Sequence, residues 1–166
     1  MSVSTAFFDQ LYAHNNDPWA FRERWYEQRK RAITLASLPR QHYPAIFEVG
    51  CANGELSAGL AQRTDWLLAC DTSAKAVELA RQRLSDCPNV EVRKSRVPEQ
   101  WPERRFDLIV ISEVAYYLDP KALEELIELA LLSLAPDGQL LACHWRPPIE
   151  GCTLTGDEVH ALLHNA

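Results

Sequence analysis

The sequence contains little positive charge and no long apolar run. Its 166 residues include 17 lysines and arginines against 23 aspartates and glutamates, a formal net charge of −6. A protein that binds nucleic acid without sequence preference needs a cationic surface to neutralise phosphates, so we expect no nucleic-acid partner. No segment is long and apolar enough for a transmembrane helix, and the amino terminus does not resemble a signal peptide. The sequence therefore predicts a cytoplasmic protein without a membrane partner.

Cysteine is also scarce, and its spacing excludes two common uses of it. None of the five cysteines forms a C-x-x-C pair, so neither a disulfide framework nor a cysteine zinc site is indicated. We expect no metal, and we expect the thiols of Cys51, Cys70 and Cys143 to pack in the core. The chain is long enough for one domain with a substantial core and too short for two ordinary ones.

Only six glycines are present, but two of them, Gly50 and Gly54, flank one short turn. Residues 46–49 before the turn have strand-like apolar character, and a helical pattern begins directly after it. Such a strand–turn–helix corner is where an open α/β sheet binds a nucleotide-like ligand. Glycine lets the backbone adopt unusual dihedral angles there, so that a ligand can lie against the chain.

The spacing of this turn does not match a dinucleotide-binding fingerprint. A Gly-x-Gly-x-x-Gly motif starting at Gly50 would need glycines where the sequence has Ala52 and Glu55. This mismatch disfavours a nicotinamide-dependent dehydrogenase. Glu48, two positions before Gly50, places a carboxylate near the end of an otherwise apolar strand. A carboxylate there suits a ligand that carries a cation better than one that carries a pyrophosphate.

Strand-like and helix-like segments alternate along the rest of the chain. The predicted strands are 46–49, 66–70, 90–92, 106–113 and 139–143, and the predicted helices include 56–62, 121–134 and 154–164. This alternation predicts a single-domain α/β protein with a Rossmann-like, doubly wound and mostly parallel sheet. Sheets of this class usually end in an antiparallel hairpin. None is visible after the fifth strand, so we expect that hairpin to be incomplete.

Residues 1–45 are predicted to form a helical cap on a core of residues 46–166. Asp17 and Pro18 are typical of a helix start, and a helical pattern follows over 19–38. This helix is the one basic segment of the acidic chain. It forms either a solvated face supported by a Glu27–Arg31 pair, or a lid that directs Tyr26 and Arg29 at a ligand carboxylate.

Polar residues follow the second and third strands, where the carboxyl edge of the sheet is expected. Asp71 lies about twenty residues after the glycine turn, the position of an acid that binds ribose hydroxyls. Alternatively Asp71, or Ser73, caps the next helix. After the third strand come Ser95, Arg96 and Val97, which would contact adenine through the backbone and an apolar side chain.

Several motifs together resemble a known family. Glu48-x-Gly50-x-x-x-Gly54 is similar to the first motif of class I S-adenosylmethionine-dependent methyltransferases. The other matching segments are Asp17-Pro18-Trp19-x-Phe21, Trp25-Tyr26-Glu27-x-Arg29-Lys30, Phe106-Asp107-Leu108-Ile109-Val110-x-Ser112-Glu113-Val114-x-Tyr116-Tyr117-Leu118, Leu134-Ala135-Pro136-Asp137-Gly138 and His144-Trp145-Arg146. Together these segments resemble the nodulation-protein-S family over nearly the whole chain. The family's founding members N-methylate the free amine of a deacetylated, chitin-like oligosaccharide.

The resemblance implies S-adenosylmethionine as cofactor and a small-molecule acceptor, such as an amino sugar. Glu48 would hold the methionine amine, and Asp71 with Thr72 would bind the ribose. The remaining residues expected to contact the cofactor are Gly50, Cys51, Ala52, Gly54, Arg96, Val97, Tyr26 and Arg29.

The expected chemistry is methyl transfer to a positioned nucleophile. Glu113 would orient the acceptor ammonium and help to remove its proton, and His144 is the alternative base. Tyr116, Tyr117 and Trp145 would offer flat faces to a sugar, or else simply pack in the core. His144 could equally be a hydrogen-bonded, partly buried histidine. An O-methyltransferase acting on a small hydroxylated metabolite and an inactive cofactor-binding module remain as alternatives.

Overall fold

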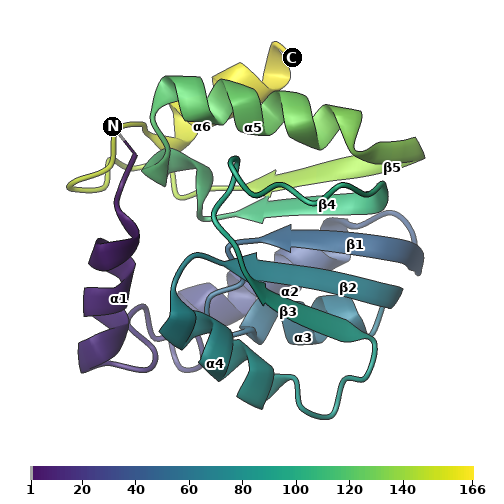
Figure 1. Ribbon diagram of the computed structural model, residues 1–166, viewed down its shortest axis with the longest axis horizontal. Coiled ribbons are helices and arrows are strands. Elements are labelled where there is room, and N and C mark those ends of the chain that lie inside the picture. The colour runs from purple at the N-terminus through teal and green to yellow at the C-terminus, as the bar shows by residue number, and fades with distance from the viewer. Residues whose placement is uncertain (1) are drawn as a thin grey trace.

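A five-stranded, entirely parallel sheet forms the centre of the computed structural model, which describes residues 2–166 (Figure 1). The strands lie in the order β3-β2-β1-β4-β5. Their bounds are β1 Tyr43–Val49, β2 Thr64–Asp71, β3 Val90–Lys94, β4 Phe106–Ser112 and β5 Leu134–Cys143. This topology confirms the predicted doubly wound α/β fold. The strand order reverses between β1 and β4, and ligands of such sheets bind beside the carboxyl ends of the strands at that point.

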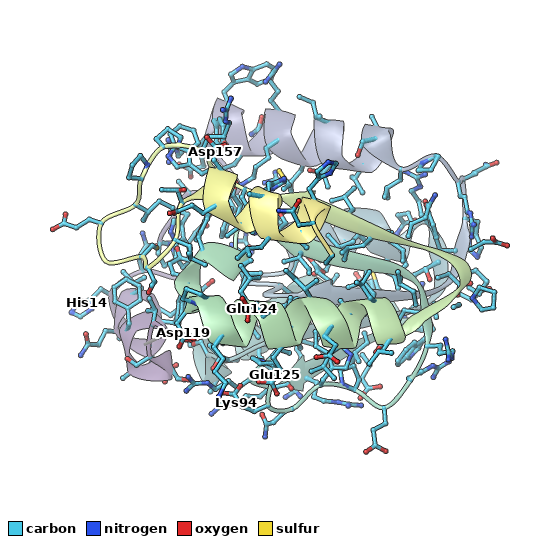
Figure 2. The ribbon with its side chains drawn as sticks, turned by 90° about the horizontal axis from the view of Figure 1, so that it is seen from above. His14, Lys94, Asp119, Glu124, Glu125 and Asp157 are labelled. Carbon is cyan, nitrogen blue, oxygen red and sulfur yellow. The ribbon has the colours of Figure 1, made fainter. Side chains whose placement is uncertain are left out.

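Helices cover both faces of the sheet. Helices α2 (Trp25–Ser37), α3 (Glu55–Ala61) and α4 (Ala74–Arg83) lie on one face. Helices α5 (Pro120–Leu132) and α6 (Gly156–His164) lie on the other face, where Figure 2 shows them next to each other in front of the sheet. The central strands are therefore buried on both sides and almost continuously apolar, as parallel strands usually are. Glu48 is the exception in β1, because it is a charged residue that is only 2 % exposed.

The amino-terminal residues lie beside the end of the sheet to which the strands point (Figure 1). Helix α1 (Thr5–His14) packs against α4 through Tyr12, Ala76 and Leu79. Its apolar residues Phe7, Phe8, Leu11 and Tyr12 recur at helical spacing. A short 3₁₀ helix, η1 (Ala115–Tyr117), follows β4 at the same end of the sheet.

The helix predicted over 19–38 begins later, at Trp25. Asp17 does not cap it. Its carboxylate instead accepts hydrogen bonds from the backbone amides of Phe21 (2.9 Å) and Arg22 (3.1 Å). Side chains of this kind compete with helical hydrogen bonding, and Ala20 adopts a φ of 54° that a helix cannot accommodate. Residues 17–24 therefore form turns and bends.

Two strand boundaries also differ from the predictions. Strand β1 starts at Tyr43, and Pro44 is tolerated because β4 pairs with β1 only from Ile46 onwards. The expected turn at 135–138 lies inside β5 as an irregularity between the pairs Phe106–Leu134 and Leu108–Gln139. In the described part of the chain no antiparallel strand follows β5, and no helix is long and apolar enough to cross a membrane.

Helix α6 begins where the sequence predicted it. The Thr155 hydroxyl accepts a hydrogen bond from the Glu158 amide, and the Glu158 carboxylate accepts from the Thr155 amide. This capping box satisfies two amide groups that a helix start otherwise leaves unpaired. It fixes α6 beside α5, with Asp157 in its first turn (Figure 2).

Candidate functional site

A cavity of about 410 Å³ opens at the carboxyl ends of β1, β2 and β4, where the strand order reverses. Its walls come from α1, the turns after α1 and the start of α2. The β1–α3 corner, η1 and Trp145, which follows His144 after β5, contribute to the walls as well. The volume suits a small molecule or cofactor. Tyr26, Glu48, Asp71, Glu113 and Trp145 all line this one cavity, although they are distant in sequence.

The β1–α3 corner forms the floor of the cavity. Gly50 has a φ of +72°, and a Cβ added there would lie 2.9 Å from Val114 Cγ2, so both backbone and space require glycine. Cys51 and Ala52 line the cavity, whereas Gly54 does not. Gly54 has a φ of +82° and precedes α3, where an added Cβ would lie 3.2 Å from Ala80. Its position lets α3 approach α4, and the cofactor contact expected of Gly54 stays a prediction.

Glu48 is a buried carboxylate in the wall of the cavity. Its Oε2 accepts a hydrogen bond from Ser57 Oγ at 2.5 Å. Burial raises the pKa of Glu48 from 4.5 to about 7, because the charged form loses hydration there. A ligand ammonium placed against this group would favour its ionised form.

Asp71 at the end of β2 is held in a fixed orientation. One carboxylate oxygen accepts from the Ala52 amide (3.0 Å) and the other from the Ser73 amide (2.9 Å). Burial raises the pKa of Asp71. Ser73, and not Asp71, caps α4. Thr72 next to it lines the cavity and bonds Thr5 Oγ1 at 2.7 Å. Each Asp71 oxygen keeps a lone pair that can accept from a ribose hydroxyl.

Among the described residues, three buried polar atoms of the cavity wall have no hydrogen-bond partner: Glu27 Oε2, which instead forms an ion pair with Lys30, and the two atoms Tyr12 Oη and Asn53 Oδ1. Buried polar groups are almost always bonded, so a bound polar ligand would account for both. They lie near Asp71 and Asp17. These groups fit S-adenosylmethionine, which offers an ammonium, a carboxylate and ribose hydroxyls. The sequence did not single out Tyr12, because only the packing of α1 on α4 brings its hydroxyl to the cavity.

The expected adenine contacts are partly taken up by the protein itself. Arg96 and Val97 line the cavity, as does Ser95. However, the Ser95 amide donates to the Asp71 carbonyl (2.9 Å) and the Arg96 amide donates to Gln100 Oε1 (2.8 Å). These two amides are therefore already bonded within the protein, and recognition of adenine through the backbone stays a prediction. The apolar side chain of Val97 remains available.

Helix α2 presents a different cation to the cavity from the one predicted. Tyr26 and Lys30 line it, but Arg29 is exposed to solvent and does not. Tyr26 and Lys30, four residues apart, share the side of α2 that borders the cavity, and Arg29 falls on the outer side. The expected Glu27–Arg31 pair is also replaced, since Glu27 pairs with Lys30 at 2.7 Å. Arg31, which lines the cavity too, donates to the Phe21 carbonyl at 2.5 Å.

Glu113 lies directly after β4, in a left-handed backbone conformation with a φ of +57°. Its carboxylate accepts from Lys30 Nζ (3.1 Å), from the Trp145 amide (2.9 Å) and from the Tyr116 hydroxyl. The Tyr116 hydroxyl is thereby committed, and burial beside Glu113 raises its pKa. Its neighbour Tyr117 also lines the cavity. Glu113 is thus a fixed acceptor group at the cavity wall.

Aromatic rings flank Glu113. Trp145 is 40 % exposed and packs edge-to-face against Tyr26 with ring centroids 5.1 Å apart. Tyr116 is buried and packs against Tyr117 and the His144 ring. Core packing therefore describes Tyr116 well, whereas Trp145 keeps a face that a ligand could contact.

His144 does not line the cavity, contrary to its expected role as a base. Its Nε2 lies 3.2 Å from the Ala115 amide, from which it accepts, so its Nδ1 is the protonated nitrogen and donates to His160 Nε2 at 3.0 Å. Both ring nitrogens are occupied, and burial lowers the pKa of His144 to about 4. The alternative of a satisfied structural histidine is the one that the structure supports.

We therefore predict that His144→Gln will affect stability and not chemistry. Loss of a buried hydrogen-bonded group should lower the free energy of unfolding by about 1–3 kcal/mol. The turnover number of the folded enzyme, measured well below its melting temperature, should change less than threefold, and its pH profile should not shift. A rate loss of a hundredfold would restore His144 as the base and favour a hydroxyl acceptor.

The chain is similar to known proteins of one family. Residues 9–161 match the family model described as Nodulation protein S. Nodulation protein S from Rhizobium tropici is 32% identical over 128 residues, which are 76% of this chain and 54% of that protein. The one from Sinorhizobium fredii is 31% identical over 127 residues, 75% of this chain and 59% of that protein. The chain thus spans little more than half the length of these relatives.

Solved structures of methyltransferases are also similar to this chain. A crystal structure of a putative methyltransferase from Pseudomonas syringae is 61% identical, with a TM-score of 0.76 and 86% of each chain covered. The N-methyltransferase NodS from Bradyrhizobium japonicum WM9, in complex with S-adenosyl-L-homocysteine, is 26% identical. Its TM-score is 0.91, and the match covers 99% of this chain and 86% of that one.

Proposed function

The chain belongs to the nodulation protein S family of S-adenosylmethionine-dependent methyltransferases, and we propose that it methylates the nitrogen of a small amine, such as an amino sugar of a deacetylated, chitin-like oligosaccharide. The observation that carries this proposal is Glu113, a mostly buried carboxylate in the wall of the same cavity as Glu48 and Asp71. The Bradyrhizobium japonicum relative is described as an N-methyltransferase, which agrees with an amine acceptor.

The cofactor would lie across the β1–α3 corner. In this proposal Glu48 holds the methionine ammonium and Asp71 accepts from the ribose hydroxyls. Residues Gly50 to Ala52 lie beneath the part of the cofactor that joins its ammonium to its ribose. Tyr12 and Asn53, whose buried polar atoms have no partner in the protein, complete the contacts. The residues before β1 act as a cap, because α1 and the start of α2 contribute to the cavity wall.

S-adenosylmethionine supplies a sulfonium methyl that is already electrophilic, so the protein's main task is to position the acceptor nitrogen in line with the S–CH₃ bond. Such positioning can supply on the order of 7–11 kcal/mol. An amine arrives as an ammonium and must lose a proton before its lone pair can attack. Glu113 orients this group and accepts the proton. The N–CH₃ bond then forms as the S–CH₃ bond breaks, and S-adenosylhomocysteine leaves.

A calorimetric titration tests the cofactor assignment. We expect micromolar binding of S-adenosylmethionine to the wild-type protein, at least tenfold weaker binding to Asp71→Asn, and no binding of NAD. Asparagine is the matched change because it retains one oxygen acceptor for the backbone amides that Asp71 now holds. If NAD bound instead, or if the variant bound as tightly as the wild type, the proposed cofactor pose would be wrong.

A further inference from the structure

The ammonium group of Lys30 lies in a box of four side chains in the cavity wall. Its Nζ is 2.7 Å from Glu27 Oε2 and 3.1 Å from Glu113 Oε1. The ring centroids of Tyr26 and Phe21 lie 5.4 and 5.8 Å from the same nitrogen. All five side chains line the cavity described above. Carboxylates and aromatic faces are the two kinds of group that attract an ammonium.

The charges in this box are largely withdrawn from water. The side chains of Glu27, Lys30 and Glu113 are only 7 %, 11 % and 16 % exposed. Two carboxylates against one ammonium leave the box with an excess negative charge. Burial of unpaired charge is costly, so the box requires a cation at this position. At present that cation comes from the protein itself.

The chemistry of lysine allows the Lys30 ammonium to leave its position between the two carboxylates. Its ammonium is a compact, strongly hydrated charge on a flexible four-carbon stem, and Lys30 Nζ accounts for one of the three donors that meet Glu113. Arg29, the residue before it, is already exposed to solvent. A ligand ammonium that enters the cavity could thus take the position of Nζ while the lysine head group returns to water.

We propose that Lys30 is a resident occupant of the acceptor-amine site, and that the acceptor's ammonium displaces it and is then held by Glu27, Glu113 and the two rings. This inference rests on the proposed N-methylation. It makes the site selective for an ammonium, because a hydroxyl or an acetylated amine has no charge with which to replace that of Lys30. It also explains the second carboxylate: while Glu113 takes the acceptor's proton, Glu27 still provides a negative charge.

Calorimetry with n-propylammonium chloride tests the displacement directly, with and without saturating S-adenosylhomocysteine. In Lys30→Met the apolar stem remains but the resident cation is gone, so we expect propylammonium to bind at least tenfold more tightly than to the wild type. n-Propanol, which lacks the charge, should bind to neither. Adding Glu27→Gln to Lys30→Met should reverse most of this gain in affinity for propylammonium. Arg29→Met, on the exposed side of the same helix, should behave as the wild type does.

Equal binding of propylammonium to wild type and Lys30→Met would overturn the inference, as would a gain that survives Glu27→Gln. Lys30 would then only join α2 to β4. Binding of S-adenosylhomocysteine shows whether each variant is folded. If Lys30→Met is not, Lys30→Gln, which can donate to both carboxylates, replaces it with the same expected gain.

Kinetics separate this inference from the proposed function. With an amine that the wild type methylates, Lys30→Met should lower KM several-fold and leave kcat within about threefold. If Lys30 only stabilised the contact between α2 and Glu113, the variant would instead lower kcat or raise KM. If wild type methylates amines and KM does not fall in the variant, the displacement is wrong and the function stands. If the variant binds propylammonium tightly but no amine is methylated, the ammonium site stands and the proposed reaction fails.

Discussion

Replacing Glu48 with glutamine is expected to stabilise the free protein at pH 8 and to weaken cofactor binding by about a hundredfold. Burial raises the pKa of Glu48 from 4.5 to about 7, so the folded protein holds a proton between these values that the unfolded chain has lost. The free energy of unfolding therefore falls as the pH rises through this window. Above pH 7 the loss amounts to on the order of 3 kcal/mol.

Glutamine removes this loss because it is never charged. Its carbonyl oxygen can still accept the hydrogen bond of Ser57 Oγ, so the variant should match the wild type near pH 4.5 and exceed it at pH 8. The measurement is urea unfolding of both proteins at pH 5, 6, 7 and 8. Glu91→Gln on β3, where the glutamate is exposed, is the matched control and should change stability by no more than about 0.5 kcal/mol.

Glu48→Gln should also lose the carboxylate that pairs with the cofactor's ammonium. Removing one member of a buried charge pair typically costs a few kcal/mol, which corresponds to the expected hundredfold loss. In the wild type, S-adenosylhomocysteine should bind up to tenfold more weakly for each pH unit below 7, because Glu48 must then be deprotonated on binding; the variant should lack this dependence. Unchanged affinity in Glu48→Gln would mean that this carboxylate does not hold the ammonium, and unchanged stability would mean that its charged form is not penalised.

The sequence was most informative where function depends on local backbone. The fold, the β1–α3 corner with Gly50, and the place of Asp71 at the end of β2 all follow from short-range patterns, because strand, turn and helix signals lie within a few residues of one another. Strand positions in a parallel sheet then bring their carboxyl ends to one edge. Glu113 was predicted as the last residue of the fourth strand, and it lies directly after β4.

What the sequence could not supply was the phase of helices and the reach of side chains. Arg29 and Lys30 are adjacent cations of α2, and only the packing of that helix decides that Lys30 lines the cavity and Arg29 is exposed. Nothing local in the sequence distinguishes these two cations. His144 failed as a base for a similar reason, since its partner His160 comes from α6, and only tertiary packing brings the two together. Glu27 appeared in the sequence merely as support for a helix face.

Glu113→Gln is expected to lower kcat for amine methylation by about a hundredfold to ten-thousandfold, the usual contribution of a positioned acid or base. The amide cannot take the acceptor's proton. It must also place its NH₂ group toward either Lys30 or the donors Tyr116 and Trp145, where it meets another donor. Affinity for S-adenosylhomocysteine should stay within about threefold, because the proposed cofactor contacts are made by Glu48 and Asp71.

The measurement is single-turnover methylation of D-glucosamine with S-adenosylmethionine in excess, followed across pH 6–9. Glu124→Gln is the control: this glutamate is exposed on α5, on the face of the sheet away from α2 (Figure 2), and its replacement should leave the rate unchanged. If Glu113→Gln kept the wild-type rate while His144→Gln lost it, the histidine would be the group that removes the proton. A hydroxyl acceptor would then be the better interpretation. If Glu113→Gln instead lost its affinity for S-adenosylhomocysteine together with its rate, Glu113 would be a cofactor contact. A rate loss with intact cofactor affinity is the result that assigns Glu113 to the acceptor amine, because it separates the loss of a proton acceptor from the loss of a cofactor contact.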